Sequence, residues 1–569
     1  MRQQDAMARI NLQVMWNRLI AVVEEQAQTL MRTAFSSMVR ECGDLSAGVF
    51  DLKGRMLAQA ITGTPGHINA MAESVGHFIE HFPLESMEDG DIYITNDPWK
   101  GTGHLNDFVV TTPCFLGGKL VAIFSCTSHL IDIGGIGYGP DAKDIHAEGI
   151  YIPFLKLAER GQMNSTLLAM IKANTRQPIE TEGDVYSLAA CNDIGCERLR
   201  GMMNEFDLSD LTELADSIIE RSHEAVLAEI AKVPPGIYKN TMTVDGYDRP
   251  IELTATTTVS KDSVHVDFDG TSPLAPFGIN VPIIYTTAYT CFGLSCIISP
   301  QIPNNAGSLA PFTVSAPVGS ILNAPFPNPV ATRHVIGQML PDVIFGCLRQ
   351  TVPERIPAEG ASCVWSLMLR GLAARRNTID GGFTITANTN GGTGARPMKD
   401  GLSATAYPSG IRGTPIEITE STSPIVYWRK EYRPNSGGAG KFRGGNGQIV
   451  ELSSLDSEPF EILAAFDRID FPPRGQDGGV DGANGHLSLS SGKVLRGKGF
   501  QNIPADDHLI ALTPGGGGLG HPFDRDPAAV QQDIIDELVS VEAAAQVYGV
   551  IFTDENEIDT VATKTARQR

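Results

Sequence analysis

The chain has 569 residues, enough for roughly two to four domains of ordinary size. Its composition, 42% hydrophobic and 19% charged residues, is typical of a folded protein and excludes a disordered or fibrous chain. The 44 Lys and Arg residues against 66 Asp and Glu residues give a net charge of −22. This acidic balance argues against nucleic acid or an anionic membrane as the main partner, because both require a basic protein surface that neutralises their charge.

The cysteine pattern and the hydropathy of the chain indicate a cytoplasmic protein. Nine cysteines, an odd number without a C-x-x-C pair, are typical of reduced thiols rather than of a disulfide framework or a zinc ribbon. No segment approaches the ~18 consecutive apolar residues of a membrane-spanning helix, and the N-terminal stretch is amphipathic rather than continuously apolar. We therefore expect a cytoplasmic protein without a membrane segment.

The first part of the chain combines helical and strand-like patterns. Apolar residues recur at helical spacing over residues 8–40, which predicts a long opening helix or a helix pair. Strand-like segments follow at residues 48–51, 91–95, 108–113 and 119–125. A helix is predicted at about 68–82, between the first two of these strands. Residues 163–232 are predicted to be mostly helical, and Pro234-Pro235-Gly236 ends this region.

The second part of the chain is rich in strand patterns and glycine. Strands are predicted from residue 238 onward, and helical character returns near residues 330–372. Residues 382–520 alternate short strands with dense glycine turns. An amphipathic helix at 527–548 then precedes a polar tail, residues 554–569, which we expect to be frayed.

These patterns predict an α+β fold, a multi-layer mixed α/β arrangement with a helical N-terminal segment and a glycine-rich, β-dominated C-terminal half. We expect an N-terminal α+β domain over residues 1–233, which would carry the functional site. A β-rich domain with the helical insert would follow over residues 234–525. Residues 526–569 would form the C-terminal helix and tail.

One polar loop between two predicted strands, residues 95–107, is the most informative segment. It carries His104 and Asp107, and a second strand then delivers Ser128 and His129. Two imidazoles and a carboxylate are a sufficient ligand set for Zn²⁺, Mn²⁺ or Fe²⁺, and Asp44 is a candidate fourth ligand. Asp, Asn and His are also common in turns, so the spacing alone fits an ordinary polar loop equally well.

Other candidate residues carry weaker signals. His67 and His146 are candidates for substrate contact or proton transfer, although each also fits an ordinary hydrogen-bonded histidine. The glycine runs 437–438 and 515–518 lack the G-x-x-x-x-G-K-[ST] pattern of a phosphate-binding loop, so we expect tight turns there. There is no G-x-S-x-G nucleophile motif and no legible ATP site.

Over nearly its whole length the chain resembles the hydantoinase B/oxoprolinase family. The stretches that carry this resemblance are Gly43-Asp44-Leu45-Ser46, Gly66-His67-Ile68, residues 96–107, Ser128-His129, residues 148–153, Asn174-Thr175-Arg176, Asn280-Val281-Pro282, Thr332-Arg333, residues 414–417, residues 436–445 and residues 513–518. So many matches in the same order are very improbable by chance.

The resemblance implies a function shared between two different proteins. Members of this family include subunits of N-methylhydantoinase and caprolactamase, half of 5-oxoprolinase, and the metal-bearing subunits of acetone and acetophenone carboxylases. The resemblance implies that a partner of the hydantoinase A type binds ATP and Mg²⁺ and phosphorylates the substrate oxygen. It further implies that the B-type chain holds a divalent metal on His104, Asp107, His129 and Asp44, in a heterotetramer or larger assembly.

The resemblance favours an ATP-dependent hydrolase that opens a lactam, hydantoin or oxoproline-type cyclic amide. In this hypothesis a metal-activated water attacks the phosphorylated substrate. The alternative is the metal-bearing subunit of an ATP-dependent ketone carboxylase, which a bicarbonate requirement would identify. A third hypothesis is a metal-free scaffold that stabilises its ATPase partner, for which changes at His104 or His129 would be harmless.

Overall fold

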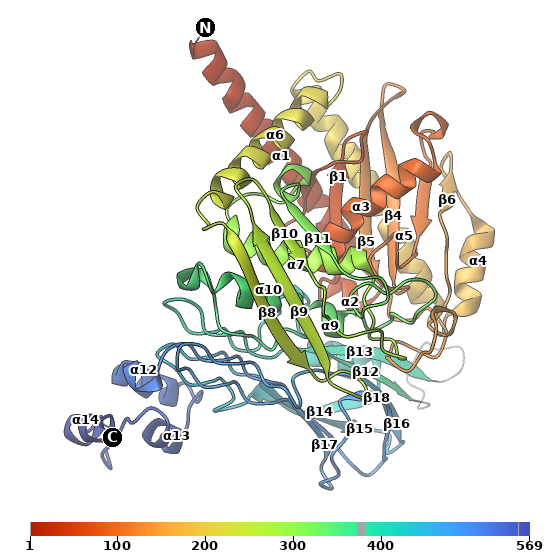
Figure 1. Ribbon diagram of the computed structural model, residues 1–569. Helices are drawn as coiled ribbons and strands as arrows, with labels where there is room; N and C mark the ends of the chain where they lie inside the picture. The colour runs from red at the N-terminus through yellow and green to blue at the C-terminus, as the bar shows by residue number, and fades with distance from the viewer. Residues whose placement is uncertain (1, 372–381, 556, 569) are drawn as a thin grey trace. The chain divides into compact units, whose positions relative to one another are not determined.

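The computed structural model describes residues 2–371, 382–555 and 557–568 (Figure 1). The chain divides into two compact units. The first unit comprises Met1–Asn240 and Thr254–Arg333, and the second comprises Thr241–Leu253 and His334–Arg569. Helices and several separate sheets occur in the chain, so the predicted α+β fold class is confirmed.

A seven-stranded sheet in the order β2-β1-β5-β4-β3-β6-β7 dominates the first unit, and its neighbouring strands are antiparallel. Its strands are β1 (Leu45–Phe50), β2 (Met56–Gln59), β3 (Ile92–Thr95), β4 (Asp107–Leu116), β5 (Lys119–His129), β6 (Leu155–Glu159) and β7 (Gln162–Met163). The strands predicted between residues 48 and 125 are confirmed. The Gly117-Gly118 turn joins β4 to β5, and both glycines have positive φ, which favours a tight hairpin.

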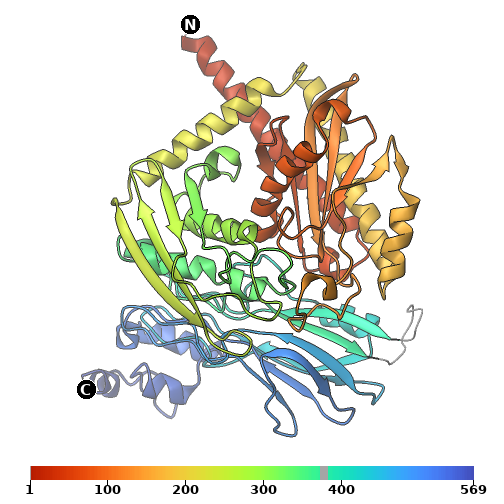
Figure 2. The same ribbon diagram turned by 45° about the vertical axis from the view of Figure 1, so that its right-hand side comes forward.

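Helices cover both faces of this sheet. Val110 and Cys126 pack with residues of the first and fifth helices, whereas Val109 and Ile123 point to the opposite face and pack with the third helix. These helices are α1 (Arg2–Thr33), α2 (Ser37–Arg40), α3 (Pro65–His81), α4 (Ser165–Asn174), α5 (Pro178–Glu205) and α6 (Thr212–Ile230). Figures 1 and 2 show α4 beside the β6 edge of the sheet. Burial on both faces explains the nearly continuous apolar runs of β4 and β5.

A second sheet has the order β11-β10-β9-β8, in which β10 and β11 are parallel. Its strands are β8 (Gly236–Val244), β9 (Ile251–Val259), β10 (Val264–Asp267) and β11 (Phe312–Ser315), and the helices α7 (Ile283–Ile298) and α8 (Ala306–Leu309) lie between β10 and β11 in sequence. Helix α7 packs on α3. The first turn of α3 lies so close to α7 that a Cβ atom at Gly66 would clash with the rings of Tyr285 and Tyr289.

Two four-stranded sheets, β13-β12-β16-β18 and β14-β15-β19-β17, share one hydrophobic core in the second unit. Their strands are β12 (Trp365–Gly371), β13 (Phe383–Thr389), β14 (Ile425–Tyr432), β15 (Gln448–Ser454), β16 (Phe460–Ala465), β17 (His486–Leu489), β18 (Lys498–Ile503) and β19 (Leu509–Leu512). The helices of this unit are α9 (His334–Gly337), α10 (Leu340–Leu348), α11 (Ile416–Thr422), α12 (Pro527–Ile535), α13 (Val541–Gln546) and α14 (Thr560–Ala566). The α-helical character predicted near 330–372 therefore ends at Leu348, and only the short 3₁₀ helix Pro353–Arg355 follows it before β12.

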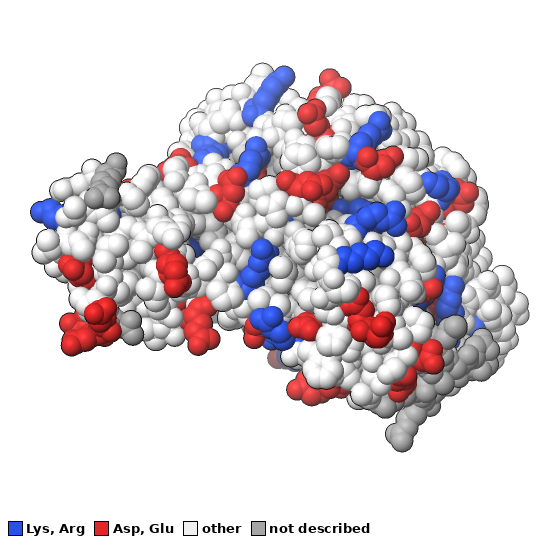
Figure 3. All heavy atoms as spheres, turned by 90° about the horizontal axis from the view of Figure 1, so that it is seen from below, with Lys and Arg blue, Asp and Glu red and all other residues white. Residues whose placement is uncertain are grey.

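The 3₁₀ helices of the chain are η1 (Leu84–Ser86), η2 (Ile145–Ala147), η3 (Pro353–Arg355) and η4 (Pro522–Asp524). Among the described residues, no helix has the length and apolarity that crossing a membrane requires. Figure 3 shows one face of the molecule, on which acidic and basic side chains are interspersed.

The glycine runs of the second unit do not form the expected tight turns. Residues 436–445 and 514–518 instead run side by side, with Gly438 N–H donating to the Gly516 carbonyl and Gly516 N–H donating to the Gly445 carbonyl, at 2.8 and 2.9 Å. A Cβ atom at Gly516 would overlap the carbonyl oxygen of Thr393. Glycine is required here for close backbone approach rather than for a positive φ, so the turn prediction is wrong.

The C-terminal segment also differs from its prediction. The single helix expected over 527–548 is two helices, α12 and α13, and Glu537 between them has a φ of 57°. The tail expected to be frayed contains α14, whose first turn is capped by the Asp559 carboxylate. This carboxylate accepts hydrogen bonds from N–H groups of the first turn, which stabilises the short polar helix.

Candidate metal centre

The hairpin β4–β5 brings together two of the predicted metal ligands. Asp107 is the first residue of β4 and His129 the last residue of β5, and the strand register pairs them directly. His104 lies three residues before Asp107 in the preceding loop. Asn96 holds this loop by donating from Nδ2 to the Leu105 carbonyl at 2.7 Å, and Asn106 holds it to β5 through the Leu130 carbonyl at 2.9 Å.

His104, Asp107 and His129 form a compact and fully buried cluster. One potential ligand atom from each residue lies within 4.8 Å of those of the other two. The exposed fractions of the three residues are 1%, 0% and 2%. His104 Nε2 is 2.7 Å from Asp107 Oδ1, and His129 Nδ1 donates to the same oxygen at 3.2 Å.

The protonation of His104 leaves a lone pair facing this carboxylate oxygen. His104 Nδ1 donates to the Ala331 carbonyl at 2.8 Å, so the proton of the neutral ring is on Nδ1. Burial, together with the nearby Arg333 cation, lowers the pKa of His104 to about 3, so the ring is neutral at physiological pH. His104 Nε2 and His129 Nε2 are both buried and have no hydrogen-bond partner within the described residues.

This donor set fits a divalent cation. Two unprotonated imidazole nitrogens and one carboxylate oxygen are ligands that Zn²⁺, Mn²⁺ and Fe²⁺ accept. Buried polar atoms are normally paired, and a nitrogen lone pair 2.7 Å from a carboxylate oxygen is repulsive unless a cation lies beside both. The Nδ1 contact of His104 to a backbone carbonyl is also the usual way in which a metal-binding histidine is oriented.

The other oxygen of Asp107 is saturated by three hydrogen-bond partners. Arg333 Nη2 donates to Oδ2 at 2.6 Å, Thr102 Oγ1 donates at 2.7 Å, and His67 Nε2 lies at 3.0 Å. Burial alone would raise the pKa of Asp107, but its pKa is well below the usual range because His67 and the Arg333 cation lie beside it and favour the ionised form. Asp107 is therefore ionised, and Oδ1 faces the two histidines.

Arg333 is a residue of this site to which the sequence assigned no role. Its guanidinium is buried, donates from Nε to the Thr102 carbonyl at 2.9 Å, and stacks 4.0 Å above the centre of the Tyr285 ring. It lies 226 residues from Asp107 in the chain, so no local spacing reveals the contact. Its presence in the Thr332-Arg333 motif of the family resemblance is the one signal that could have identified it.

Asp44 and His67 lie beside this cluster. His67, in the first turn of α3, has Nδ1 3.5 Å from Asp44 Oδ1 and Nε2 3.0 Å from Asp107 Oδ2. Burial lowers the pKa of His67, but the carboxylates of Asp107 and Asp44 outweigh burial and raise it. The Asp44 carboxylate also accepts from Thr64 Oγ1 at 3.1 Å. Asp44 is thus separated from the cluster by His67, and it is not among the three mutually adjacent ligand atoms.

The structure does not bring His146 to the cluster. It is an exposed residue of η2, and its ring packs edge-on against Phe326 with 5.9 Å between ring centres. A different aromatic residue, Tyr138, borders the cluster, because its ring centre lies 4.6 Å from that of His129 and 5.8 Å from that of His104. Burial raises the pKa of Tyr138 well above its usual range, so it stays a neutral phenol. The sequence offered only the glycine-rich loop 134–139 as a sign of its importance.

The chain is similar to known proteins over most of its length. The family model for hydantoinase B/oxoprolinase matches residues 8–522. A protein of Pseudomonas sp. (strain NS671), named as the B-type component of a "Putative D-/L-hydantoinase", is 30% identical over 98% of this chain and 98% of its own length.

Two solved structures share the fold. The ATP-dependent caprolactamase from Pseudomonas jessenii superposes with a TM-score of 0.89 at 26% identity, covering 99% of both chains. A nucleotide-free acetone carboxylase superposes with a TM-score of 0.83 at 19% identity, covering 98% of this chain and 82% of that one, and at this identity the likeness concerns the fold alone. Because the family model spans nine-tenths of the sequence, the chain belongs to the hydantoinase B/oxoprolinase family.

Proposed function

We propose that this chain is the metal-binding subunit of an ATP-dependent, two-component hydrolase that opens a cyclic amide. The observation that carries the proposal is the buried contact between His104 Nε2 and Asp107 Oδ1, two acceptors 2.7 Å apart with no proton to share. A divalent cation among His104, Asp107 and His129 accounts for this contact. The relatives named as a hydantoinase component and as an ATP-dependent caprolactamase support the reaction class.

The ATP-dependent step is assigned to a partner of the hydantoinase A type. The hydantoinase relative is named as one subunit of its enzyme, which supports a second component. The chain itself has no G-x-x-x-x-G-K-[ST] motif for nucleotide phosphates. The partner would bind ATP and Mg²⁺ and phosphorylate the amide oxygen, which weakens amide resonance. Water added to the ring carbon would let the C–N bond break, with the protonated amine as leaving group and an acyl phosphate as the other end. A second water would then hydrolyse the acyl phosphate to a carboxylate and phosphate.

The residues of this chain would then direct water to the activated carbon. A divalent metal bound at this site supplies Lewis acidity, which lowers the pKa of a coordinated water toward neutrality. Asp107 stays ionised because Arg333 and Thr102 hold its other oxygen. His67 lies between two carboxylates, so it can hold a proton at Nε2 and be stabilised as a cation by Asp44 and Asp107.

The experiment combines the chain with its ATP-binding partner and a cyclic amide such as ε-caprolactam or hydantoin. The proposal expects ring opening that requires ATP and the metal, proceeds without bicarbonate, and is lost in His104→Ala and His129→Ala. His77→Ala, at a partly exposed histidine of α3, is the matched control and should retain activity. A reaction of ketones that requires bicarbonate would instead establish the carboxylase alternative, whose members share this fold. Full activity in both ligand variants would establish the scaffold hypothesis.

A further inference from the structure

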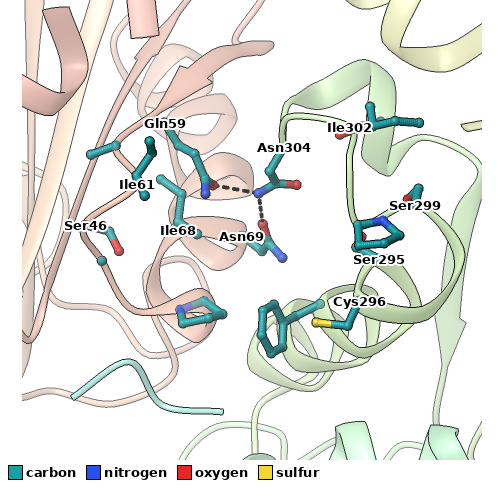
Figure 4. Close-up of a pocket in the computed structure, with 16 residues that line it drawn as sticks. Ser46, Gln59, Ile61, Ile68, Asn69, Ser295, Cys296, Ser299, Ile302 and Asn304 are labelled. Atoms are coloured by element: carbon teal, nitrogen blue, oxygen red, sulfur yellow. Dashed lines mark hydrogen bonds between the residues drawn. The ribbon is translucent and has the colours of Figure 1, made fainter. Parts of the chain in front are cut away.

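A cavity of about 300 Å³ lies in the first unit at one end of the α3–α7 contact (Figure 4). Residues from the end of β2, the first turn of α3, the last turns of α7 and the segment after α7 line it. Ile61, which is 83% exposed, stands at its rim, so small molecules can reach it from solvent. Its volume is at the lower end of the range for small-molecule sites.

The lining of this cavity is polar but uncharged. Among the described residues that form it there is no Asp, Glu, Lys, Arg or His. Its polar groups are mainly carboxamides and hydroxyls, and Ile68 and Phe292 supply apolar surface. An ion would lose its hydration here without gaining a counter-charge, so the cavity favours a neutral ligand.

Three carboxamides form an ordered chain on one wall. Asn304 Nδ2 donates to Gln59 Oε1 at 2.6 Å and to Asn69 Oδ1 at 2.7 Å, and Asn69 Nδ2 donates to the Ala288 carbonyl at 3.2 Å (Figure 4). These contacts fix which end of each amide carries nitrogen. Asn304 Oδ1 remains as an acceptor and Gln59 Nε2 as a donor, neither used by another described residue. Figure 4 shows Asn304 Oδ1 directed away from Gln59, toward Ile302 and Ser299.

The wall of the cavity is continuous with the metal centre. Ser46 lines the cavity and donates from Oγ to the Thr64 carbonyl at 3.2 Å, while Thr64 Oγ1 donates to Asp44. On α7, Tyr285 and Tyr289 lie on the same face of the helix as the cavity residues Phe292 and Cys296. At the start of this face, the Tyr285 ring packs against the Arg333 guanidinium. The cavity and the metal centre therefore share the same two helices.

We propose that this cavity is a recognition site for a small, uncharged cyclic amide. A lactam ring combines a carbonyl acceptor, an N–H donor and apolar ring atoms, which match Gln59 Nε2, Asn304 Oδ1 and the Ile68–Phe292 surface. A hydantoin ring offers two carbonyl and two N–H groups of the same kind. The choice of an amide over other neutral ligands rests on the proposed function. The ring-opened product is charged, as a zwitterion from a lactam or a carboxylate anion from a hydantoin, and the uncharged lining excludes it.

The test measures binding of ε-caprolactam to the full chain without ATP or partner, by calorimetry and saturation-transfer NMR. Asn304→Asp adds a charge and removes both donors of Asn304, whereas Ser295→Leu fills the cavity without adding charge. Asn304→Asp should weaken binding at least about tenfold, because it adds an unpaired charge to the lining and breaks the ordered carboxamide chain. Ser295→Leu should weaken binding to a similar extent, because its side chain takes up volume that the ligand needs. Asn204→Asp, on the exposed surface of α5, makes the same charge change outside the cavity and should bind normally.

The outcomes separate this inference from the metal proposal. Caprolactam binding that persists in His104→Ala and is lost in Asn304→Asp and Ser295→Leu supports the cavity, whatever the metal content. Metal content and melting temperature of the two cavity variants report whether they fold. No binding to the native chain at millimolar caprolactam, equal binding by folded cavity variants, or equally tight binding of 6-aminohexanoate would overturn the inference.

Discussion

His104 Nε2 and Asp107 Oδ1 face each other at 2.7 Å, and the His104 ring donates its Nδ1 proton to the Ala331 carbonyl. The second carboxylate oxygen of Asp107 is fully occupied by Arg333, Thr102 and His67. One oxygen is thus tied to the protein, and the other is left for the histidines. This division of the two oxygens is the geometry expected of a metal-binding carboxylate with an ordered outer shell.

Replacing Arg333 with Lys should weaken metal binding. The substitution keeps the positive charge but loses the planar fork that reaches Asp107 and the Thr102 carbonyl together. Loss of such an outer-shell partner costs about 10–100-fold in metal affinity. Chelator competition measures the affinity. Arg198→Lys, which changes an exposed pair with Glu25, is the control, and equal affinities for the two variants would contradict the assigned role.

Replacing His67 with Gln should separate metal binding from proton transfer. Gln can still contact Asp107 but cannot carry a proton, so we expect kcat to fall by about 10²–10⁴-fold while metal content stays unchanged. The measurement is kcat alongside metal stoichiometry for the same preparation. Loss of the metal would instead make His67 a ligand, and unchanged kcat would exclude it from proton transfer.

The contribution of Glu148 to the free energy of unfolding should fall as pH rises. Burial raises the pKa of Glu148 to about 8, although its Oε1 accepts the N–H groups of Val330 and Ala331. Because the folded-state pKa lies above the unfolded value of about 4.3, the folded chain holds the proton more tightly between these two values. The stabilising contribution of Glu148 is therefore highest at about pH 4 and declines as pH rises to about 8.

Glu148→Gln tests this relationship, because Gln resembles the protonated acid and keeps the two accepted hydrogen bonds. The variant should gain stability relative to the native chain as pH rises toward 8, by at most about 5 kcal/mol. Denaturant unfolding at several pH values measures the difference. A difference that does not change with pH would show that Glu148 keeps an ordinary pKa.

Gly516→Ala should destabilise the second unit strongly. Its Cβ atom would overlap the Thr393 carbonyl, and backbone on both sides cannot move away easily. We expect a loss of at least about 3 kcal/mol, in the range of severe overpacking. Gly492→Ala is the control, since its Cβ meets open space and its positive φ costs only about 1 kcal/mol. Similar melting temperatures for both variants would contradict the close-packed arrangement.

The sequence predicted those parts of the fold that depend on local pattern. The opening helix pair appears as α1 and α2, and the helix predicted at 68–82 appears as α3, because their apolar spacing is set by neighbouring residues. Strands β4 and β5 were predictable for the same reason. Their short glycine turn then brings Asp107 and His129 together, as expected from the family resemblance rather than from the spacing alone.

Features that depend on distant backbone contacts could not be predicted this way. Arg333 reaches Asp107 from 226 residues away, and no periodicity records that contact. The glycine run 515–518 has the composition of turns, yet it packs against other backbone segments. His146 has the residue type of a catalytic group, but its position in η2 leaves it exposed.

Metal content of the purified chain is the most direct test of the central claim. Elemental mass spectrometry should find about one equivalent of Zn, Mn or Fe in the native protein, and that metal should be absent from His104→Ala and His129→Ala, with folding matched by circular dichroism. His77→Ala should keep it. A native chain that stays metal-free after reconstitution, or folded ligand variants that retain the metal, would contradict the assignment of His104, Asp107 and His129 as a metal centre.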